Sequence, residues 1–149
     1  MPRFMVIMKG DERSEAGELP TPEQFEAMNG FNEELVRNGV MLAGEGLHPT
    51  SKGAKVRVQR SQRTVIDGPF TEAKEIVAGF WLWQCRSLDE AIEWVKRIPF
   101  EAFDDGTDRV GEVEIRQIFE SDDFGKNLPD TVRESEARMR KEIAQQHGA

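Results

Sequence analysis

Hydrophobic and polar residues alternate along the chain with two periods, and each period predicts one kind of element. Short apolar runs bounded by turn residues are typical of strands, whereas apolar residues three and four positions apart are typical of amphipathic helices. The pattern predicts a strand at 3–9, a helix at 22–38, a strand at 40–43, a hairpin at 55–58 and 64–66, a strand at 77–85, a helix at 88–98 and a strand at 112–119.

Capping residues mark the starts of both predicted helices. Thr21 can cap the first helix, and Pro22 fits its first position, where no backbone donor is needed. The second helix opens with Ser87 and Glu90, which have the spacing of a capping box. Gly39 is expected to close the first helix as a left-handed cap.

The order of these elements predicts an α+β fold. Without the inserted hairpin it is the split βαβ order of a ferredoxin-like sheet, with both helices on one face. The strand at 77–85 is apolar on both faces, because Phe80 and Leu82 alternate with Trp81 and Trp83. A sheet face left bare and bearing two tryptophans would be an exposed apolar patch that monomers rarely tolerate. We therefore expect a homodimer in which two sheets pack face to face.

The chain divides by composition into residues 1–120, the α+β domain, and residues 121–149, a charged C-terminal helical extension. The extension has a helix start at Pro129 and a thin apolar stripe of Val132, Met139 and Ile143. It is expected to be an arm against the domain or a partner subunit; the alternative is a free helix.

Composition and charge exclude several classes of function. A net charge of −8 argues against direct nucleic-acid binding, which needs clustered basic residues. Alternating basic residues around 55–63 are expected on the wet face of the hairpin. No apolar run approaches the roughly 20 residues of a membrane span or a signal-peptide core, so we expect a cytoplasmic protein. Cys85 is the only cysteine, and no metal-binding or cofactor-binding motif occurs, so neither a metal nor a cofactor is expected.

One stretch identifies a family. "DGPFTEAKE" at 67–75, followed by "AGFWLW" and "SLDEAIEWVKRIP", resembles the DGPF-domain branch of the YCII-related proteins. The resemblance covers residues 3–119. It implies a dimeric α+β barrel of ferredoxin-like subunits, in a family of which most members lack an established activity. It also implies an association with extracytoplasmic-function sigma factors, and so a sigma factor as a candidate partner.

The chain departs from the wider family at its proposed catalytic pair. That pair is a histidine on the first helix and an aspartate just before a Pro-aromatic step. The helix at 22–38 contains no histidine, and Ile98 precedes Pro99-Phe100. The mechanism proposed for that pair therefore does not transfer to this chain.

The candidate site residues surround the DGPF motif. Asp67 ends a strand before Gly68-Pro69, where it either sets a turn or serves as a general base or ligand anchor. His48 lies in a Gly/Pro loop, where it is either an exposed loop residue or a partner in proton transfer. The predicted site comprises Asp67 and His48 as catalytic residues and Phe70, Lys74, Glu45 and Trp81 as ligand-binding residues.

Three functions remain open at this point. The first is a small-molecule-binding or regulatory module, linked through the resemblance to a sigma factor. The second is a cofactor-independent small-molecule enzyme that uses Asp67 for acid-base chemistry. The third is a purely structural dimer.

Overall fold

A computed structural model describes residues 1–69, 72, 75–107 and 110–148. The chain forms two compact units, residues Met1–Gln117 and Ile118–Ala149. Among the described residues, no helix has both the length and the apolar character needed to span a bilayer.

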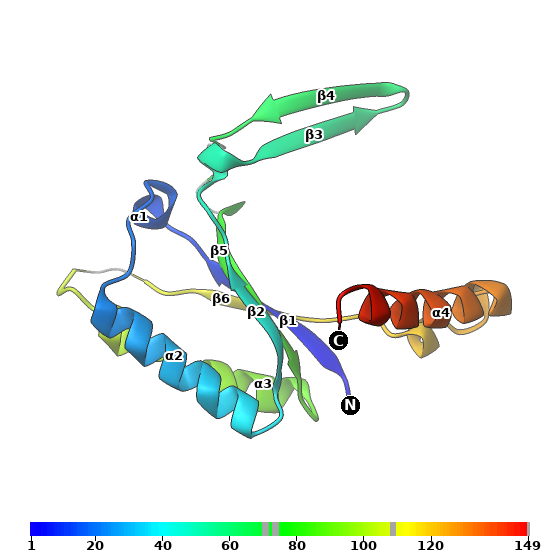
Figure 1. Cartoon of the computed structure of the whole chain (residues 1–149). Coiled ribbons are helices and arrows are strands. Elements are labelled where there is room, and N and C mark those ends of the chain that lie inside the picture. Colours follow the sequence, from blue (N-terminus) through cyan, green and yellow to red (C-terminus); the bar gives the residue numbers. More distant parts are fainter. Residues whose placement is uncertain (70–71, 73–74, 108–109, 149) are drawn as a thin grey trace. The chain divides into compact units, whose positions relative to one another are not determined.

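The first unit is built on a four-stranded antiparallel sheet with strand order β2-β5-β1-β6. Its strands are β1 (Arg3–Lys9), β2 (Met41–Gly46), β5 (Val77–Gln84) and β6 (Val113–Gln117). The helices α2 (Pro22–Arg37) and α3 (Leu88–Val95) lie on the same side of the sheet (Figure 1). This is the ferredoxin-like order, so the predicted α+β fold is confirmed.

The helix ends follow the predicted caps, with one difference. The Thr21 hydroxyl accepts from the Gln24 N–H at 3.2 Å, and Gly39 follows α2 at φ +69°. Ser87 caps α3 by accepting from the Glu90 N–H at 3.2 Å. The other half of the predicted capping box is absent, because the Glu90 carboxylate accepts from the Arg86 N–H, at 2.6 Å, and not from the N–H of Ser87.

Both tryptophans of β5 face the helices, and the expectation that they lie on the bare face of the sheet is wrong. Trp83 is fully buried, and Trp81 is 6% exposed. The Trp81 ring meets the Phe31 ring edge-on at 6.0 Å, and its indole N–H donates to Asn32 Oδ1 at 2.9 Å. The larger aromatic rings of the strand therefore fill the core between sheet and helices.

The opposite face, which we name the open sheet face, carries the other half of the alternation. Its centre is Met5, Ile7, Phe80 and Leu82, which are only partly buried and lie outside the core cluster. The strand register places them in two rows across the sheet, Glu45–Phe80–Ile7–Glu114 and Ala43–Leu82–Met5–Arg116. The open sheet face is thus an apolar centre with charged residues on the outer strands.

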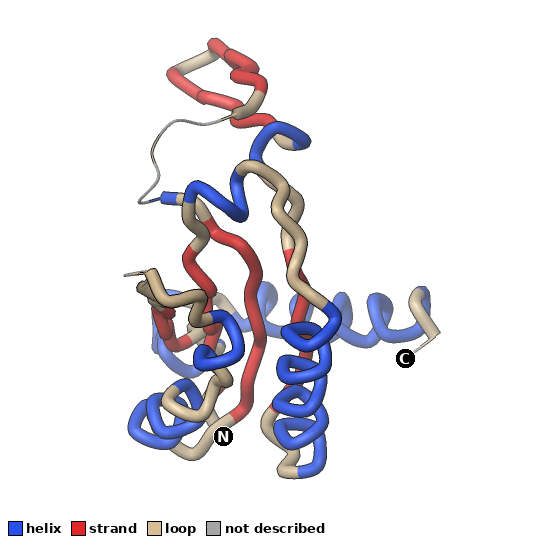
Figure 2. Tube along the Cα trace, turned by 90° about the vertical axis from the view of Figure 1, so that its left-hand side faces the viewer, coloured by secondary structure: helices blue, strands red, loops and turns tan. Residues whose placement is uncertain are grey.

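The predicted hairpin forms a separate two-stranded sheet, β3 (Ala54–Gln59) with β4 (Gln62–Asp67). Figure 2 shows its strands set apart from those of the main sheet. A 3₁₀ turn, η1 (Thr50–Lys52), precedes the hairpin. Within the hairpin every side chain is exposed except that of Ile66, which is partly buried. The sequence pattern did not predict η1 or two other short elements of this unit, α1 (Glu12–Glu15) and η3 (Phe100–Phe103).

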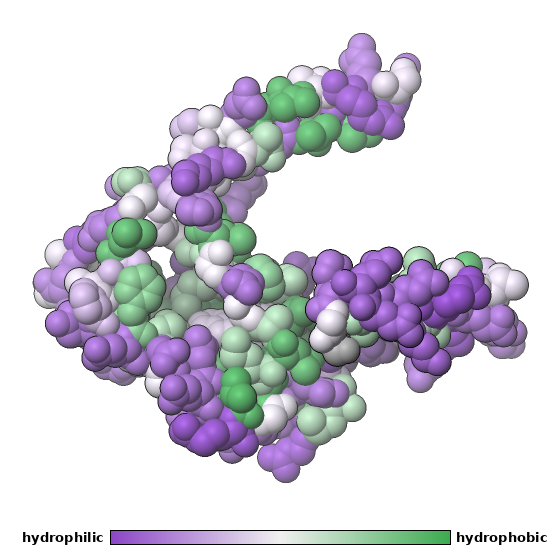
Figure 3. Space-filling view, in the orientation of Figure 1, coloured by the Kyte–Doolittle hydropathy of each residue, from purple (hydrophilic) through white to green (hydrophobic). Residues whose placement is uncertain are grey.

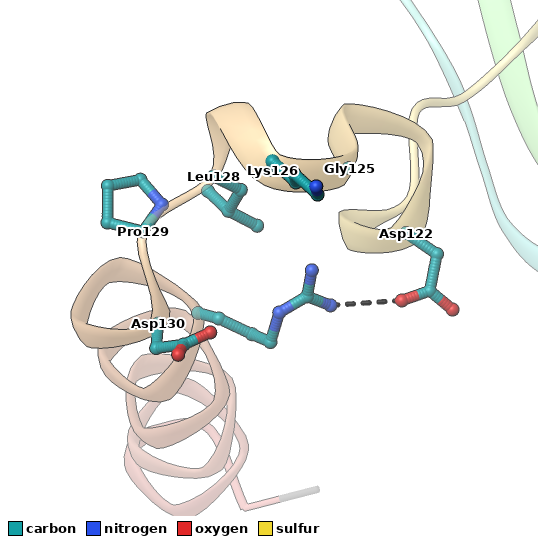
Figure 4. A pocket seen from close by; sticks show the side chains of 7 residues that line it. Asp122, Gly125, Lys126, Leu128, Pro129 and Asp130 are labelled. Carbon is teal, nitrogen blue, oxygen red and sulfur yellow. Dashed lines mark hydrogen bonds and ion pairs between the residues drawn. The ribbon is translucent and has the colours of Figure 1, made fainter.

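The second unit contains the 3₁₀ segment η4 (Ser121–Asn127) and the helix α4 (Asp130–Gln146). The Phe119 and Phe124 rings stack at 4.9 Å, and Arg133 pairs with Asp122 at 3.0 Å. That pair spans an open depression of about 560 Å³ between η4 and the start of α4 (Figure 4). The predicted apolar stripe of α4 is exposed, at 41% for Val132, 49% for Met139 and 58% for Ile143, and its role as an arm stays a prediction.

Candidate functional site

The first half of the DGPF motif is locked to the backbone that leads into the hairpin. The Gly68 N–H donates to the Gly53 carbonyl at 3.1 Å. A Cβ at residue 68 would lie 1.7 Å from the carbonyl oxygen of Thr50 and 2.5 Å from its carbonyl carbon. No side chain fits in that space, so glycine at this position is a steric requirement.

A carboxylate from α1 holds the other side of the same loop. The Thr50 N–H donates to Glu15 Oε1 at 2.6 Å. The second oxygen, Oε2, is buried and has no hydrogen-bond partner within the described part of the chain. We name Glu15, Thr50, Gly53, Asp67 and Gly68 the hairpin base.

The sequence pattern missed Glu15 because its segment was interpreted as a polar loop. Asp11 and Ser14 form a reciprocal cap at the start of α1, with both bonds near 2.9 Å. An Asp followed three residues later by a hydroxyl residue was the local signal for this helix. The contact with Thr50 carries no such signal, since it joins residues 35 positions apart.

The motif also ends beside the start of α1. The Gly10 N–H donates to the Ile76 carbonyl at 2.9 Å, and Ile76 is buried. Glu75 pairs with Lys55 of β3 at 3.8 Å, an exposed contact worth at most about 1 kcal/mol. The first end of the motif is therefore fixed to the loop before the hairpin, at Thr50 and Gly53, and the residue that follows the motif, Ile76, is fixed to Gly10.

Three of the predicted site residues lie near the end of β2, in the connection that follows it, and at the base of the hairpin. Asp67 ends β4, His48 lies between β2 and η1, and Glu45 lies near the end of β2; all three are exposed. Trp81 belongs instead to the core on the helix side. The remaining two, Phe70 and Lys74, lie outside the described residues.

Beyond the sheet end, α1 is tied to the loop after η3 by an ion pair between Arg13 and Asp105. The Thr107 hydroxyl donates to Asp105 at 2.5 Å, and this bond, with the Arg13 contact, holds the pKa of Asp105 well below its ordinary range. Because the pKa of Asp105 is lower in the folded chain than in the unfolded chain, its ionised carboxylate stabilises the fold at neutral pH. This stabilisation is lost as the pH falls.

Cys85 is buried and serves as a core residue. Burial, with a smaller effect of the Glu90 charge, raises the pKa of its thiol to about 11. We expect no reaction of the folded protein with Ellman's reagent near pH 8, and one thiol per chain in urea. Stability should fall as the pH rises from roughly 8.5, where an unfolded thiol titrates, towards 11, because only the unfolded chain releases its proton there.

Urea unfolding at the two ends of this pH range measures the effect. Cys85→Ala is the control, since it removes the titrating thiol. Its free energy of unfolding should change less with pH over the same range. Rapid labelling of the folded wild-type protein at pH 8 would contradict a buried thiol.

No group of three or more His, Cys, Asp or Glu side chains is placed to hold a metal ion among the residues that the structure describes. A second open depression, of about 540 Å³, lies beside α3. There the Arg97 guanidinium sits 4.6 Å from the centre of the Trp94 ring and pairs with Glu34. The residues of this depression and of the Arg97 contacts do not include any residue of the hairpin base.

Comparison with known proteins finds a relative that matches part of the chain. An uncharacterised protein of Rhizobium meliloti (strain 1021) is 44% identical over 50 residues, which cover 34% of this chain and 40% of that protein. The chain therefore matches less than half the length of this relative.

The comparison with solved structures returns 5-chloro-2-hydroxyhydroquinone dehydrochlorinase (TftG) from Burkholderia phenoliruptrix AC1100, in complex with 2,5-dihydroxybenzoquinone. It is 19% identical, with a TM-score of 0.38 over 75% of this chain and 90% of that chain. The family model of the YCII-related domain matches residues 2–122. The chain therefore belongs to the YCII-related domain family.

Proposed function

We propose that this chain is the subunit of a homodimeric, small-molecule-binding module with a regulatory role. The observation that carries the proposal is the open sheet face, an apolar centre of four side chains within a charged rim. Apolar patches rimmed by polar residues mark interaction sites in soluble proteins. A second copy placed sheet to sheet would cover the patch in a two-fold arrangement, in which each subunit presents the same surface.

The ligand site in this proposal lies between the end of β2 and the base of the hairpin, where Glu45, His48 and Asp67 are exposed. Two sheets packed face to face leave a hollow at their ends, with apolar walls from the sheet and polar groups from the loops. Carboxylates accept hydrogen bonds, so Glu45 and Asp67 favour a ligand that offers hydroxyl or amine donors. The His48 ring offers one nitrogen that can donate a hydrogen bond and one that can accept.

The dimer is tested by placing a charge at the centre of the open sheet face. Leu82→Glu should weaken dimerisation about 100-fold or more, because a buried unpaired carboxylate faces its own two-fold copy. Light scattering and sedimentation equilibrium measure the change. Val36→Glu is the matched control, since Val36 is 61% exposed on α2, and it should leave the dimer intact. A wild-type protein that is monomeric at micromolar concentrations would contradict the proposal.

The ligand site is tested by a metabolite screen with thermal shift as the readout. A ligand at 100 times its Kd adds about 2.7 kcal/mol to the free energy of unfolding. Asp67→Asn should leave the melting temperature of the ligand-free protein unchanged, because the side chain is exposed, and should reduce the ligand-induced shift. Glu26→Gln, an exposed change on α2, is the control. An equal shift in Asp67→Asn and wild type would remove Asp67 from the site.

The regulatory role is proposed on the resemblance to the DGPF branch, with a sigma factor as partner. Co-purification of a sigma factor, and a ligand-dependent change in its transcription, would support this role. Absence of both would leave ligand binding standing and remove the regulatory assignment.

Acid-base catalysis is the second candidate, and the hairpin base supplies an observation in its favour. A buried carboxylate oxygen without a described hydrogen-bond partner, Glu15 Oε2, lies at the hairpin base. Glu15 bonds to Thr50, and the Thr50 carbonyl lies against Gly68. Gly68 follows Asp67 in the chain, and Asp67 is the general base of this candidate mechanism. Turnover of a ligand from the screen, abolished in Asp67→Asn at unchanged stability, would establish an enzyme.

A further inference from the structure

One face of the β3–β4 hairpin carries an exposed cluster of three valines. Val56 and Val58 of β3 are each 59% exposed, and Val65 of β4 is 64% exposed. Val56 lies directly opposite Val65, and the period of two puts Val58 on the same face. Figure 3 shows hydrophobic residues gathered along this hairpin. We name these three residues the valine face.

On β3 the alternation is strict, but β4 breaks it: Arg63 lies on the valine face, opposite Val58, and Ile66 lies opposite Lys55 on the other face, which is mostly polar. The cross-strand pairs Arg57–Thr64 and Gln59–Gln62 lie there. A strand that alternates in this way has one face meant for water and one for packing. A two-stranded hairpin alone is at best marginally stable in water, which is a further reason to expect a partner against the valine face.

The tip of the hairpin holds a basic residue in an unfavourable conformation. Arg60 has φ 55°, a region that costs a non-glycine residue roughly 1–2 kcal/mol. The Arg63 guanidinium donates to the carbonyls of Arg60, at 2.9 Å, and Gln62, at 3.2 Å. A glycine at residue 60 would relieve this strain but would also remove the positive charge. The sequence therefore keeps an arginine at a position where the backbone conformation favours glycine.

Charge indicates what the hairpin meets. Four of the 20 basic residues of the chain and one of its 28 acidic residues lie in Ala54–Asp67. The remainder of the chain is therefore strongly acidic, and the hairpin is a basic arm on an acidic protein. A second copy of the same chain offers both the negative charge that the arm lacks and a two-fold arrangement that satisfies both arms.

We propose that the hairpin is an intersubunit arm whose valine face packs on a second copy of this chain. The inference rests on the proposed homodimer and adds a second contact to it. The arm follows β2, whose Glu45 borders the open sheet face, after a connection of residues 47–53 that contains η1. The partner copy then contributes its arm to the surroundings of the proposed ligand site.

The test is a pair of double substitutions on the two faces of the same strands. V56S/V65S should weaken dimerisation about 30-fold in sedimentation equilibrium, because the serines bury less apolar surface against the partner than the two valines do. Q59S/Q62S carries the same number of serines on the polar face and should change the Kd by less than threefold. Raising the salt concentration should weaken the wild-type dimer, and less so in Arg60→Gln.

Hydrogen exchange separates this inference from the proposed dimer. Hairpin amides should become protected as the protein concentration rises through the Kd of the dimer, and should lose that protection in V56S/V65S. If Leu82→Glu breaks the dimer while V56S/V65S leaves both Kd and protection unchanged, the arm is overturned and the dimer stands. A wild-type protein that stays monomeric overturns both.

Discussion

Gly68→Ala is expected to open the hairpin base and to lower the free energy of unfolding by about 2–3 kcal/mol. The added Cβ would lie 1.7 Å from the Thr50 carbonyl oxygen, well inside contact distance, and both nearest atoms belong to the backbone. A backbone cannot rotate away as a side chain does, so Thr50 or Gly68 must move. Overpacking of this kind costs about 1–3 kcal/mol, and loss of the Gly68–Gly53 hydrogen bond adds to it.

The neighbouring Gly53 provides the matched control. It is extended, with φ −124°, and a Cβ there would lie 3.6 Å from the same carbonyl oxygen, an ordinary contact. Gly53→Ala should therefore stay within about 0.5 kcal/mol of wild type. Urea unfolding gives the stabilities, and amide exchange at Thr50 and Gly68 locates the change. Equal effects of the two substitutions would mean that the close approach of Gly68 to Thr50 does not limit the fold.

Trp83→Ala is expected to cost about 3–5 kcal/mol, because it empties the largest fully buried side chain of the core. The ring packs between Phe31 at 6.4 Å and Trp81 at 5.5 Å, so both aromatic contacts are lost with it. A loss of this size can exceed half the stability of a small domain, and denaturant unfolding at low temperature keeps the variant measurable.

Two phenylalanine substitutions separate the ring from its N–H. The Trp83 indole nitrogen is buried with no partner among the described residues, whereas the Trp81 N–H donates to Asn32. Trp81→Phe breaks a hydrogen bond and strands the Asn32 oxygen, so it should cost about 1 kcal/mol more than Trp83→Phe. The reverse order would indicate that Trp83 has a hydrogen-bond partner in solution.

The fold was largely predictable because its strands and helices have strong periods. The caps at Thr21 and Ser87 and the apolar runs around them are local signals, and they placed both helices and all four strands of the sheet. The side on which Trp81 and Trp83 lie was not predictable in the same way. An alternation of period two states that a strand has two faces without stating which face meets the helices.

The site was predictable only in part, for a related reason. Asp67 and Gly68 stand out because an acid, a glycine and a proline at a strand end form a local motif. Glu15 is invisible from its own surroundings, since its role depends on a contact with Thr50 that only the folded chain creates. Long-range pairs of this kind have no sequence period, and a single sequence cannot supply them.

The hairpin is inserted between two strands that are already neighbours in the sheet. Gly46 of β2 pairs with Gly79 of β5, and the Leu47 N–H donates to the Ala78 carbonyl at 2.8 Å. The β2–β5 ladder therefore closes before the insertion begins, and a short turn from Leu47 to Val77 would preserve the hydrogen bonds between these two strands. In evolutionary terms the arm is a module. It can lengthen, change charge or disappear without altering the hydrogen bonding of the sheet that carries it.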